Sequence, residues 1–427
     1  MHHNATVVGV NDWKLSPTAR AIALASLFVG LLLWRAPNLL LYPRLWAEEG
    51  RFYYNALQDG TSPFTLVVRG NYQIITNLIC YMATLVPTEW AAHVTTYCSL
   101  LVALWCIILF SQFSVESGWS LAISALAVAI FALCAQGYEV YLSSTNVQWL
   151  SALSLLFICI MPWHNLRRLR GALLYVWVVV CALSGVPSSI MTPVLLIRGR
   201  VFRSTIHFRL GLILAAGAAI QATIIILHPH PDRSFSLTTL IVTASWLLQT
   251  VASPLFAAGW VEFLIWFLRW LKSGYAVALA YIALSSIAIF AMVASYRASK
   301  EKAAVMVLAL VWIFVPIVQI FGGLGDPDSL ISGSMQGRYF FIGVVCFVTL
   351  LGIAVNRASP RARLPALSLL VVALGAGIFQ ARHGNWQSPM IFGPSWSEQV
   401  ADCNGHRPCE VQAWPGGPEW TFMLHRR

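Results

Sequence analysis

The sequence predicts an all-α protein that crosses a membrane many times. Of its 427 residues, 58% are hydrophobic and only 10% are charged, and the mean hydropathy is +0.72. Soluble domains carry about 25% charged residues, so this composition is typical of a polytopic membrane protein. The formal net charge of +11 indicates basic cytoplasmic loops and contact with anionic lipid, and it does not indicate a nucleic-acid partner.

The first two apolar segments differ in length. Residues 21–41 form an apolar run interrupted by Arg35 and Pro37. This run is longer than a signal-peptide core and lacks a small-residue cleavage site, so we expect a retained spanning helix. Residues 74–86 form a run of only about 13 residues, well below the ~20 that a spanning helix needs. We expect this second segment to be a helix that lies in or dips into the outer interface.

Four basic loops predict the orientation of the chain, because short loops rich in Lys and Arg belong on the cytoplasmic side. With all four inside, the hydropathy pattern gives about 11 spans by the ~20-residue criterion. The stretch between His230 and Arg297 also fits three crossings in place of one, which gives about 13. The four loops cover residues 164–170, 198–209, 296–302 and 357–363.

The predicted organisation is a transmembrane module followed by a small extracytoplasmic tail. The module covers residues 1–380, and its first outer loop, residues 42–90, contains the interfacial helix. The tail covers residues 381–427 and is predicted to be a small irregular cap. Because the polar side chains near span ends gather on the outer side in this orientation, we expect the functional surface to face outward.

The nine cysteines form two groups. Cys403 and Cys409 flank a polar window in the tail, and a disulfide between them is expected if the tail lies outside the cytoplasm. The others lie in apolar stretches, where a free thiol behaves as a small hydrophobe: Cys80, Cys98, Cys106, Cys134, Cys159, Cys181 and Cys346.

Metal-ligand patterns are weak in this sequence. No CxxC pair or zinc-ligand spacing occurs. The HPHPD motif contains His228, His230 and Asp232, but its prolines stiffen an extended loop, so we do not expect a metal site there.

The first outer loop contains the segment WAEEGRFYYNALQDG, residues 46–60, with Glu48 and Glu49 adjacent to each other and close to Arg51. A partly desolvated carboxylate near a cation can take a proton from an attacking hydroxyl. The alternative is a solvated turn whose carboxylates face water, as exposed acids in loops usually do.

A second motif, GYEVYLSSTNVQW at residues 137–149, places Glu139, Asn146 and Gln148 at the outer end of a predicted span. Amide side chains at a helix start either cap the helix or bind a polar ligand. The aromatic residues of the motif are more typical of anchors at a membrane interface.

A third motif, SMQGRYFF at residues 334–341, opens a late span and contains Gln336, Arg338 and Tyr339. The Arg338 guanidinium fits a pair of phosphate oxygens through two parallel hydrogen bonds. The alternative is an arginine that extends to the membrane interface without a ligand.

Taken in order, these motifs resemble the GT-C superfamily of polytopic glycosyltransferases, which use sugars carried on polyprenyl phosphate. Within it, the chain is most similar to bacterial enzymes that modify surface polysaccharide or O-antigen. The likeness covers residues 20–427 in layout, and the motifs that carry it are short: WAEEG, GNYQIITNLICYMATLVP, STNVQW and QGRYFF.

The resemblance implies an inverting transfer of a sugar from a polyprenyl-phosphate carrier to a hydroxyl of a glycan or lipid acceptor, at the outer face of a bacterial inner membrane. It implies a general base in the first outer loop, at Glu48 or Glu49. Many family members have Asp-Glu or Glu-Asp there, so the Glu-Glu pair leaves the choice open; Glu48 is favoured, with Glu49 as a positioning acid. Some family members use a divalent metal and others do not, which leaves a metal cofactor open. The expected substrate-binding residues are Arg338, Arg51, Arg69, Tyr72, Glu139, Asn146, Gln148, Gln336 and Tyr339.

Two alternatives belong to other functional classes. A transporter or lipid flippase should place ionisable residues near the bilayer midplane and often has repeated halves, whereas the charges here gather at span ends and no repeat is evident. A polysaccharide polymerase or ligase would also use a lipid-linked sugar.

Overall fold

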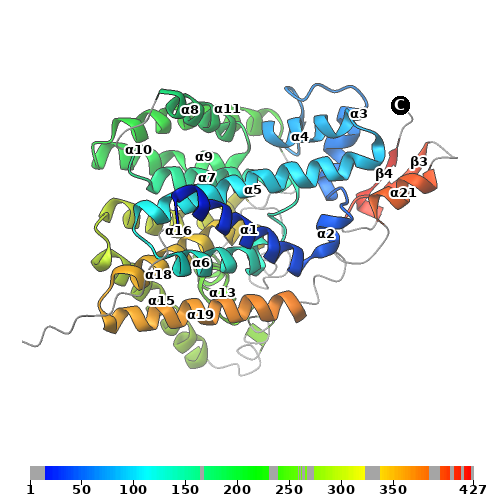
Figure 1. Ribbon diagram of the computed structural model, residues 1–427. Coiled ribbons are helices and arrows are strands. Elements are labelled where there is room, and N and C mark those ends of the chain that lie inside the picture. Colours follow the sequence, from blue (N-terminus) through cyan, green and yellow to red (C-terminus); the bar gives the residue numbers. More distant parts are fainter. Residues whose placement is uncertain are drawn as a thin grey trace, which may run out of the picture.

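The computed structural model is largely helical (Figure 1). Two small antiparallel hairpins make up the sheet structure of the described residues. These residues are 15–163, 168–229, 239–257, 259, 261, 265–266, 274–322, 337–383, 395–403, 408–414 and 418–424.

The first apolar run folds as two helices, α1 (Pro17–Arg35) and α2 (Pro37–Leu41). Ser16 caps α1 by accepting a hydrogen bond from the Ala19 N–H at 3.2 Å, and a proline occupies the first helical position, where no N–H partner is needed. The helix stops ahead of the proline that begins α2, because the residue before a proline disfavours the helical conformation.

The first loop is compact and contains several short elements. The turn of its hairpin has positive φ at Arg69 (49°) and Gly70 (68°), the conformation of a tight two-residue connection. The helix expected over residues 74–86 is present and is 11 residues long. The elements are the π-helix η1 (Glu49–Tyr54), α3 (Asn55–Gln58), β1 (Val67–Val68), β2 (Asn71–Tyr72) and α4 (Ile74–Thr84).

The described residues from 88 to 383 form a helical bundle. Its longer helices are α5 (Ala91–Glu116), α6 (Leu121–Leu133), α7 (Val147–Ile160), α8 (Arg168–Ala182), α10 (Thr192–Val201), α11 (Thr205–Leu227), α12 (Thr239–Leu247), α15 (Gly274–Ala298), α16 (Lys302–Gly322), α18 (Phe341–Arg357) and α19 (Pro360–His383). The short elements between them are η2 (Thr88–Trp90), η3 (Ala135–Gly137), η4 (Ser144–Asn146), α9 (Val186–Ile190), the π-helix η5 (Leu248–Ala252), α13 (Ser253–Phe256) and η6 (Gly337–Phe340).

Within the described residues, six helical segments are long and apolar enough to cross a membrane. Several other apolar helices are shorter; α6, for example, has 13 residues, a length of about 20 Å. The predicted membrane class is therefore supported, whereas the predicted count of about 11 or 13 spans stays a prediction. The six segments are Pro17–Arg35, Thr88–Glu116, Thr205–Leu227, Gly274–Ala298, Gly337–Arg357 and Pro360–His383.

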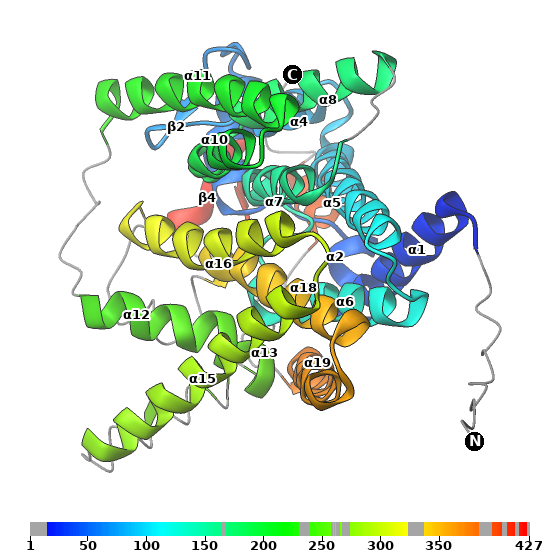
Figure 2. The same ribbon diagram turned by 90° about the vertical axis from the view of Figure 1, so that its left-hand side faces the viewer.

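Helix α18 is the centre of the bundle. Each of its residues from Phe341 to Val355 is buried, and it packs against α6, α15, α16 and α19, as Figure 2 shows. A helix that is apolar on all sides must be surrounded by protein or lipid to be stable, and here neighbouring helices surround α18. The site elements that precede α18 therefore stand on a rigid support.

A break in the helical path after α8 is covered by protein. Gly185, with φ 103°, separates α8 from α9, and α9 packs against α7, α11 and α16. Irregular backbone at membrane depth is tolerated when neighbouring protein covers it.

The two ends of the bundle have different surroundings: the tail packs at one end, and charged side chains border a cavity at the other. At one end, Trp396 of the tail donates its Nε1–H to the Thr88 carbonyl at 2.6 Å, next to the start of α5. The other end of α5 lies about 39 Å away by helix geometry. There, a cavity of about 190 Å³ is bordered by Glu116, Lys300 and Arg357.

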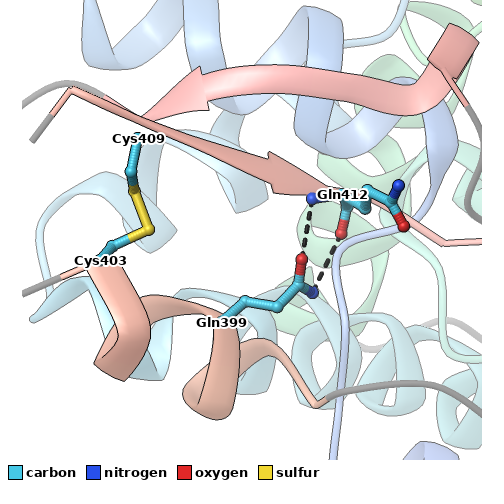
Figure 3. Close-up of a disulfide and its surroundings, with 4 residues drawn as sticks. All are labelled: Gln399, Cys403, Cys409 and Gln412. Carbon is cyan, nitrogen blue, oxygen red and sulfur yellow. Dashed lines mark hydrogen bonds between the residues drawn. A yellow bond between two sulfur atoms is a disulfide. The ribbon is translucent and has the colours of Figure 1, made fainter. Parts of the chain in front are cut away.

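The C-terminal tail is a folded unit beside the first loop (Figure 1). Figure 3 shows the Cys403–Cys409 disulfide and the two hydrogen bonds that Gln399 makes with the backbone of Gln412. The tail was expected to be irregular, but its described residues form regular elements. Trp386, in the same tail, lies outside the described residues. The elements are α21 (Trp396–Asp402), β3 (Cys409–Gln412), η9 (Pro418–Trp420) and β4 (Thr421–Leu424).

Candidate functional site

A cavity of about 150 Å³ lies between the first loop and the helical bundle. Sites that enclose a whole drug-sized ligand are larger, about 300 Å³ or more, so this cavity can enclose only part of such a ligand. Its polar wall is formed by Glu48, Arg69, Asn71, Gln73, Thr145, Asn146, Gln148 and Arg338.

An apolar wall faces these polar groups. It is formed by α9, by Val318 near the C-terminal end of α16 and by two aromatic rings, Trp149 and Tyr339, which meet edge to face with centroids 5.3 Å apart. A cavity with one polar and one apolar wall can accept an amphipathic ligand. The aliphatic residues of this wall are Val186, Pro187, Ile190 and Val318.

Glu48 is the acid of the adjacent pair that reaches the cavity. Its side chain is 22% exposed, and its Oε1 lies 3.6 Å from Nη1 of Arg69. Arg69 extends from the hairpin turn, and its guanidinium also lies 5.0 Å from the ring centre of Phe52. The Arg69 guanidinium therefore lies beside the Glu48 carboxylate and leaves part of that carboxylate accessible.

Glu49 has a different environment. It is fully buried, its Oε2 accepts the Trp46 N–H at 2.8 Å, and its Oε1 accepts the Ser144 N–H at 2.7 Å. Burial raises the pKa of Glu49, and the hydrogen bonds from Ser144 and Trp46 oppose that rise. Glu49 ties the first loop to η4 and does not line the cavity.

Arg338 reaches the polar wall of the cavity from a distant part of the chain. η6 presents it directly before α18, and its Nη1 donates to Oε2 of Glu139 at 3.0 Å. Burial raises the pKa of the Glu139 carboxyl, while the neighbouring Arg338 guanidinium lowers it. Glu139 acts on the cavity through Arg338 and is not one of its lining residues.

The amides of the second motif lie in the cavity wall. Asn146 donates its Nδ2–H to the Glu139 carbonyl at 2.7 Å, and Gln148 donates its Nε2–H to the Thr145 carbonyl at 3.3 Å. Gly185 makes room for Gln148: a Cβ at that glycine would lie 2.5 Å from the Gln148 Oε1. The structure therefore brings Asn146 and Gln148 together with Glu48 and Arg338.

Besides Glu139, two of the expected ligand-binding residues, Arg51 and Tyr72, do not line the cavity. Arg51 donates to the Glu419 carbonyl of the tail. Tyr72 donates its hydroxyl hydrogen to the Phe64 carbonyl at 3.1 Å. Gln336 lies outside the described residues.

The cavity also contains residues that sequence reasoning missed. Asn71 and Trp149 each present a buried polar atom, Oδ1 and Nε1, without a hydrogen-bond partner in the described part of the chain. Nearly all buried polar atoms in proteins are paired, so these two are available to water or a ligand. A signal for Asn71 existed in its position directly after the Arg69–Gly70 turn, whereas Trp149 resembled a membrane-interface anchor.

Among the described residues, no group of three or more His, Cys, Asp or Glu side chains is arranged to hold a metal ion. The polar wall instead combines one carboxylate, two guanidinium groups and several amides. No protein-family model, curated protein or solved structure matches this chain.

Proposed function

We propose that the protein transfers a sugar from a polyprenyl-phosphate carrier to a hydroxyl of a glycan or lipid acceptor. The observation that carries this proposal is that one cavity holds Glu48 of the first loop and Arg338 before α18. An acid and a cation in one polar wall provide what a hydroxyl nucleophile and a phosphate leaving group require.

In the proposed reaction, Glu48 accepts the proton of the acceptor hydroxyl while the oxygen attacks the anomeric carbon. The bond between that carbon and the phosphate oxygen breaks, and the polyprenyl phosphate leaves with the bonding electrons. Arg338 and Arg69 stabilise the negative charge on the phosphate. A phosphate is a good leaving group, so a strong general acid is not needed.

The apolar wall supports a lipid-linked donor. Val186, Pro187 and Ile190 of α9 face the cavity together with Val318 of α16. In the proposed complex, the first isoprene units of the carrier lie against this wall, and the sugar lies against Asn71 and Gln148. The lipid path in this complex runs between α9 and α16. Helix α4 contributes Gln73, the residue directly before its first turn, to the cavity wall.

The distribution of charge supports an outward-facing cavity in a bacterial inner membrane. The opposite end of the bundle contains Arg297, Lys300, Lys302 and Arg357, and basic short loops belong on the cytoplasmic side. We therefore propose that the first loop and the tail are extracytoplasmic.

The proposal is tested with purified protein, a polyprenyl-phospho-sugar and an acceptor glycan, by measuring release of polyprenyl phosphate. Glu48→Gln should lower turnover by about 10²–10⁴-fold, the usual contribution of a general base. Asp59→Asn is the matched control, because Asp59 is an exposed acid of the same loop. Full turnover by a folded Glu48→Gln variant would contradict the assignment, and lipid translocation without bond cleavage would favour a flippase.

A further inference from the structure

We infer that the C-terminal tail, residues 395–424, is a brace that sets the position of Glu48, and that Trp414 is its main positioning residue. The effect on catalysis rests on the proposed function, whereas the effect on the position of the first loop does not. Four sets of contacts between the tail and this loop support the inference.

The first set is a backbone bridge directly before Glu48. The Trp414 N–H donates to the Leu45 carbonyl at 2.7 Å, and the Ala47 N–H donates to the Trp414 carbonyl at 2.5 Å. These bonds form a parallel β-bridge between Trp46 and Trp414, whose rings lie 4.2 Å apart. Both backbone groups of Trp414 therefore bond to the residues on either side of Trp46, just before Glu48, although Trp414 lies more than 300 residues later in the chain.

The second set lies directly after the acid pair. Gly50 packs so closely on the tail that an added Cβ would lie 2.7 Å from Cε1 of Phe422 and 3.0 Å from Cβ of Ala413. Arg51, the next residue, donates to the Glu419 carbonyl. The tail thus contacts the chain on both sides of Glu48 and Glu49.

The third contact reaches the cation that pairs with Glu48. The guanidinium of Arg69 lies 5.7 Å from the ring centre of Trp420, in the tail, and 3.6 Å from Glu48. The tail therefore contacts both members of the Glu48–Arg69 ion pair, directly or through adjacent residues.

The fourth set anchors the tail at the end of the first loop, where α5 begins. Trp396 is fully buried and bonds to the Thr88 carbonyl, as described above. The disulfide and the Gln399–Gln412 hydrogen bonds hold α21 against β3 (Figure 3). A segment that is held rigid and anchored where α5 begins can transmit its position to the residues around Glu48.

Positioning of this kind matters because a general base must lie within about 2.6–3.2 Å of the proton that it accepts. A displacement of about 1 Å from a distant mutation can lower a rate by about 100-fold. Arg338 is held by η6 and Glu139, so loss of the brace should displace the base and leave the phosphate-binding group in place. The expected signature is a lower kcat with little change in KM for the lipid donor.

The test compares full-length wild type, Trp414→Ala, Trp414→Phe and the control Met423→Ala in nanodiscs. Met423 lies in the same hairpin and is 41% exposed. The first readout is hydrogen–deuterium exchange of peptides that cover residues 44–54, which contain the Ala47 N–H of the bridge. The second is kcat and KM with a polyprenyl-phospho-sugar.

Trp414→Ala should accelerate exchange at residues 44–54 while peptides from α18 stay unchanged, and it should lower kcat about 100-fold with KM within about threefold. Trp414→Phe should recover most of the loss, and Met423→Ala should match wild type. Unchanged exchange at residues 44–54 in Trp414→Ala would overturn the brace, and so would faster exchange with an undiminished kcat. Faster exchange in a protein whose wild type has no transferase activity would refute the proposed function and leave the brace standing.

If Trp414→Ala does not fold, Gly50→Ala provides the same test from the other side of the contact, because its added methyl group would collide with Phe422. It should show the same accelerated exchange and the same fall in kcat. Wild-type behaviour of a folded Gly50→Ala variant would overturn the inference.

Discussion

At the scale of single residues, the site depends on a division of work between two adjacent carboxylates. The wide turn of η1 begins at Glu49, whose carboxylate bonds to the N–H groups of Trp46 and Ser144. Glu48, one residue earlier, lies beside Arg69 in the cavity wall. A buried acid that accepts hydrogen bonds from two N–H groups stabilises the fold, and a partly exposed acid beside a cation is available for proton transfer.

Replacing the buried acid should affect stability before chemistry. Glu49→Gln keeps one oxygen acceptor and turns an NH₂ group toward one of the two N–H donors, so the free energy of unfolding should fall by about 1–3 kcal/mol. Thermal unfolding in detergent measures this loss, with Gln112→Ala, a substitution on the exposed face of α5, as the control. An unchanged melting temperature combined with lost turnover would instead identify Glu49 as a reacting group.

The sequence located part of this residue set. Glu48, Asn146, Gln148 and Arg338 stood out because each is polar at the end of an apolar segment, and all four lie in the cavity wall. Arg51 has the same sequence features, yet it contacts the tail, because the direction of a side chain in an irregular loop depends on distant contacts. No local pattern encodes that direction.

At the scale of elements, the first loop and the tail form one unit. Leu45 and Tyr54 of the loop share a small core with Trp396 and Phe422 of the tail. The sequence predicted the short helix α4 from its length and the disulfide from its polar surroundings. It did not predict the hairpin of β3 and β4, because each strand has only four residues and their pairing partners are separated by segments without apolar periodicity.

Removing the disulfide should loosen this unit. Cys403 and Cys409 are six positions apart, and the chain-entropy model gives about 2 kcal/mol for closing so short a loop. The Cys403→Ser, Cys409→Ser double variant should therefore show faster hydrogen–deuterium exchange in peptides covering residues 408–424. Cys98→Ser is the control, because Cys98 is a free thiol on α5. Identical exchange in the double variant and wild type would show that the hairpin is stable without the disulfide.

At the scale of the whole molecule, composition was the most informative property of the sequence. Low charge and high hydropathy predicted a helical membrane protein, and six segments of the described chain are long and apolar enough to span. The number of spans was harder to predict, since helices such as α6 and α7 are shorter than a bilayer is thick. Their burial against α18 replaces contact with lipid, and such packing leaves little trace in hydropathy.

The proposed orientation predicts which end of the bundle is reachable from outside the cell. Met423→Cys, in the tail, should react with a membrane-impermeant maleimide in intact cells, and Lys300→Cys, at the basic end, should react only after permeabilisation. Both side chains are exposed, and wild type measures the background from its own thiols. Labelling of Lys300→Cys in intact cells would reverse the orientation.

The central claim is that the cavity with Glu48 and Arg338 binds one lipid-linked sugar, with the Arg338 guanidinium on its phosphate and the Glu48 carboxylate on the attacking hydroxyl. The most direct measurement is an electron cryomicroscopy map of the protein with bound polyprenyl phosphate. The account predicts phosphate density within hydrogen-bonding distance of Arg338, with the isoprene chain along α9 and α16 and with space for a sugar between the phosphate and Glu48. Density for the phosphate at any other place, with the cavity between Glu48 and Arg338 empty, would contradict it.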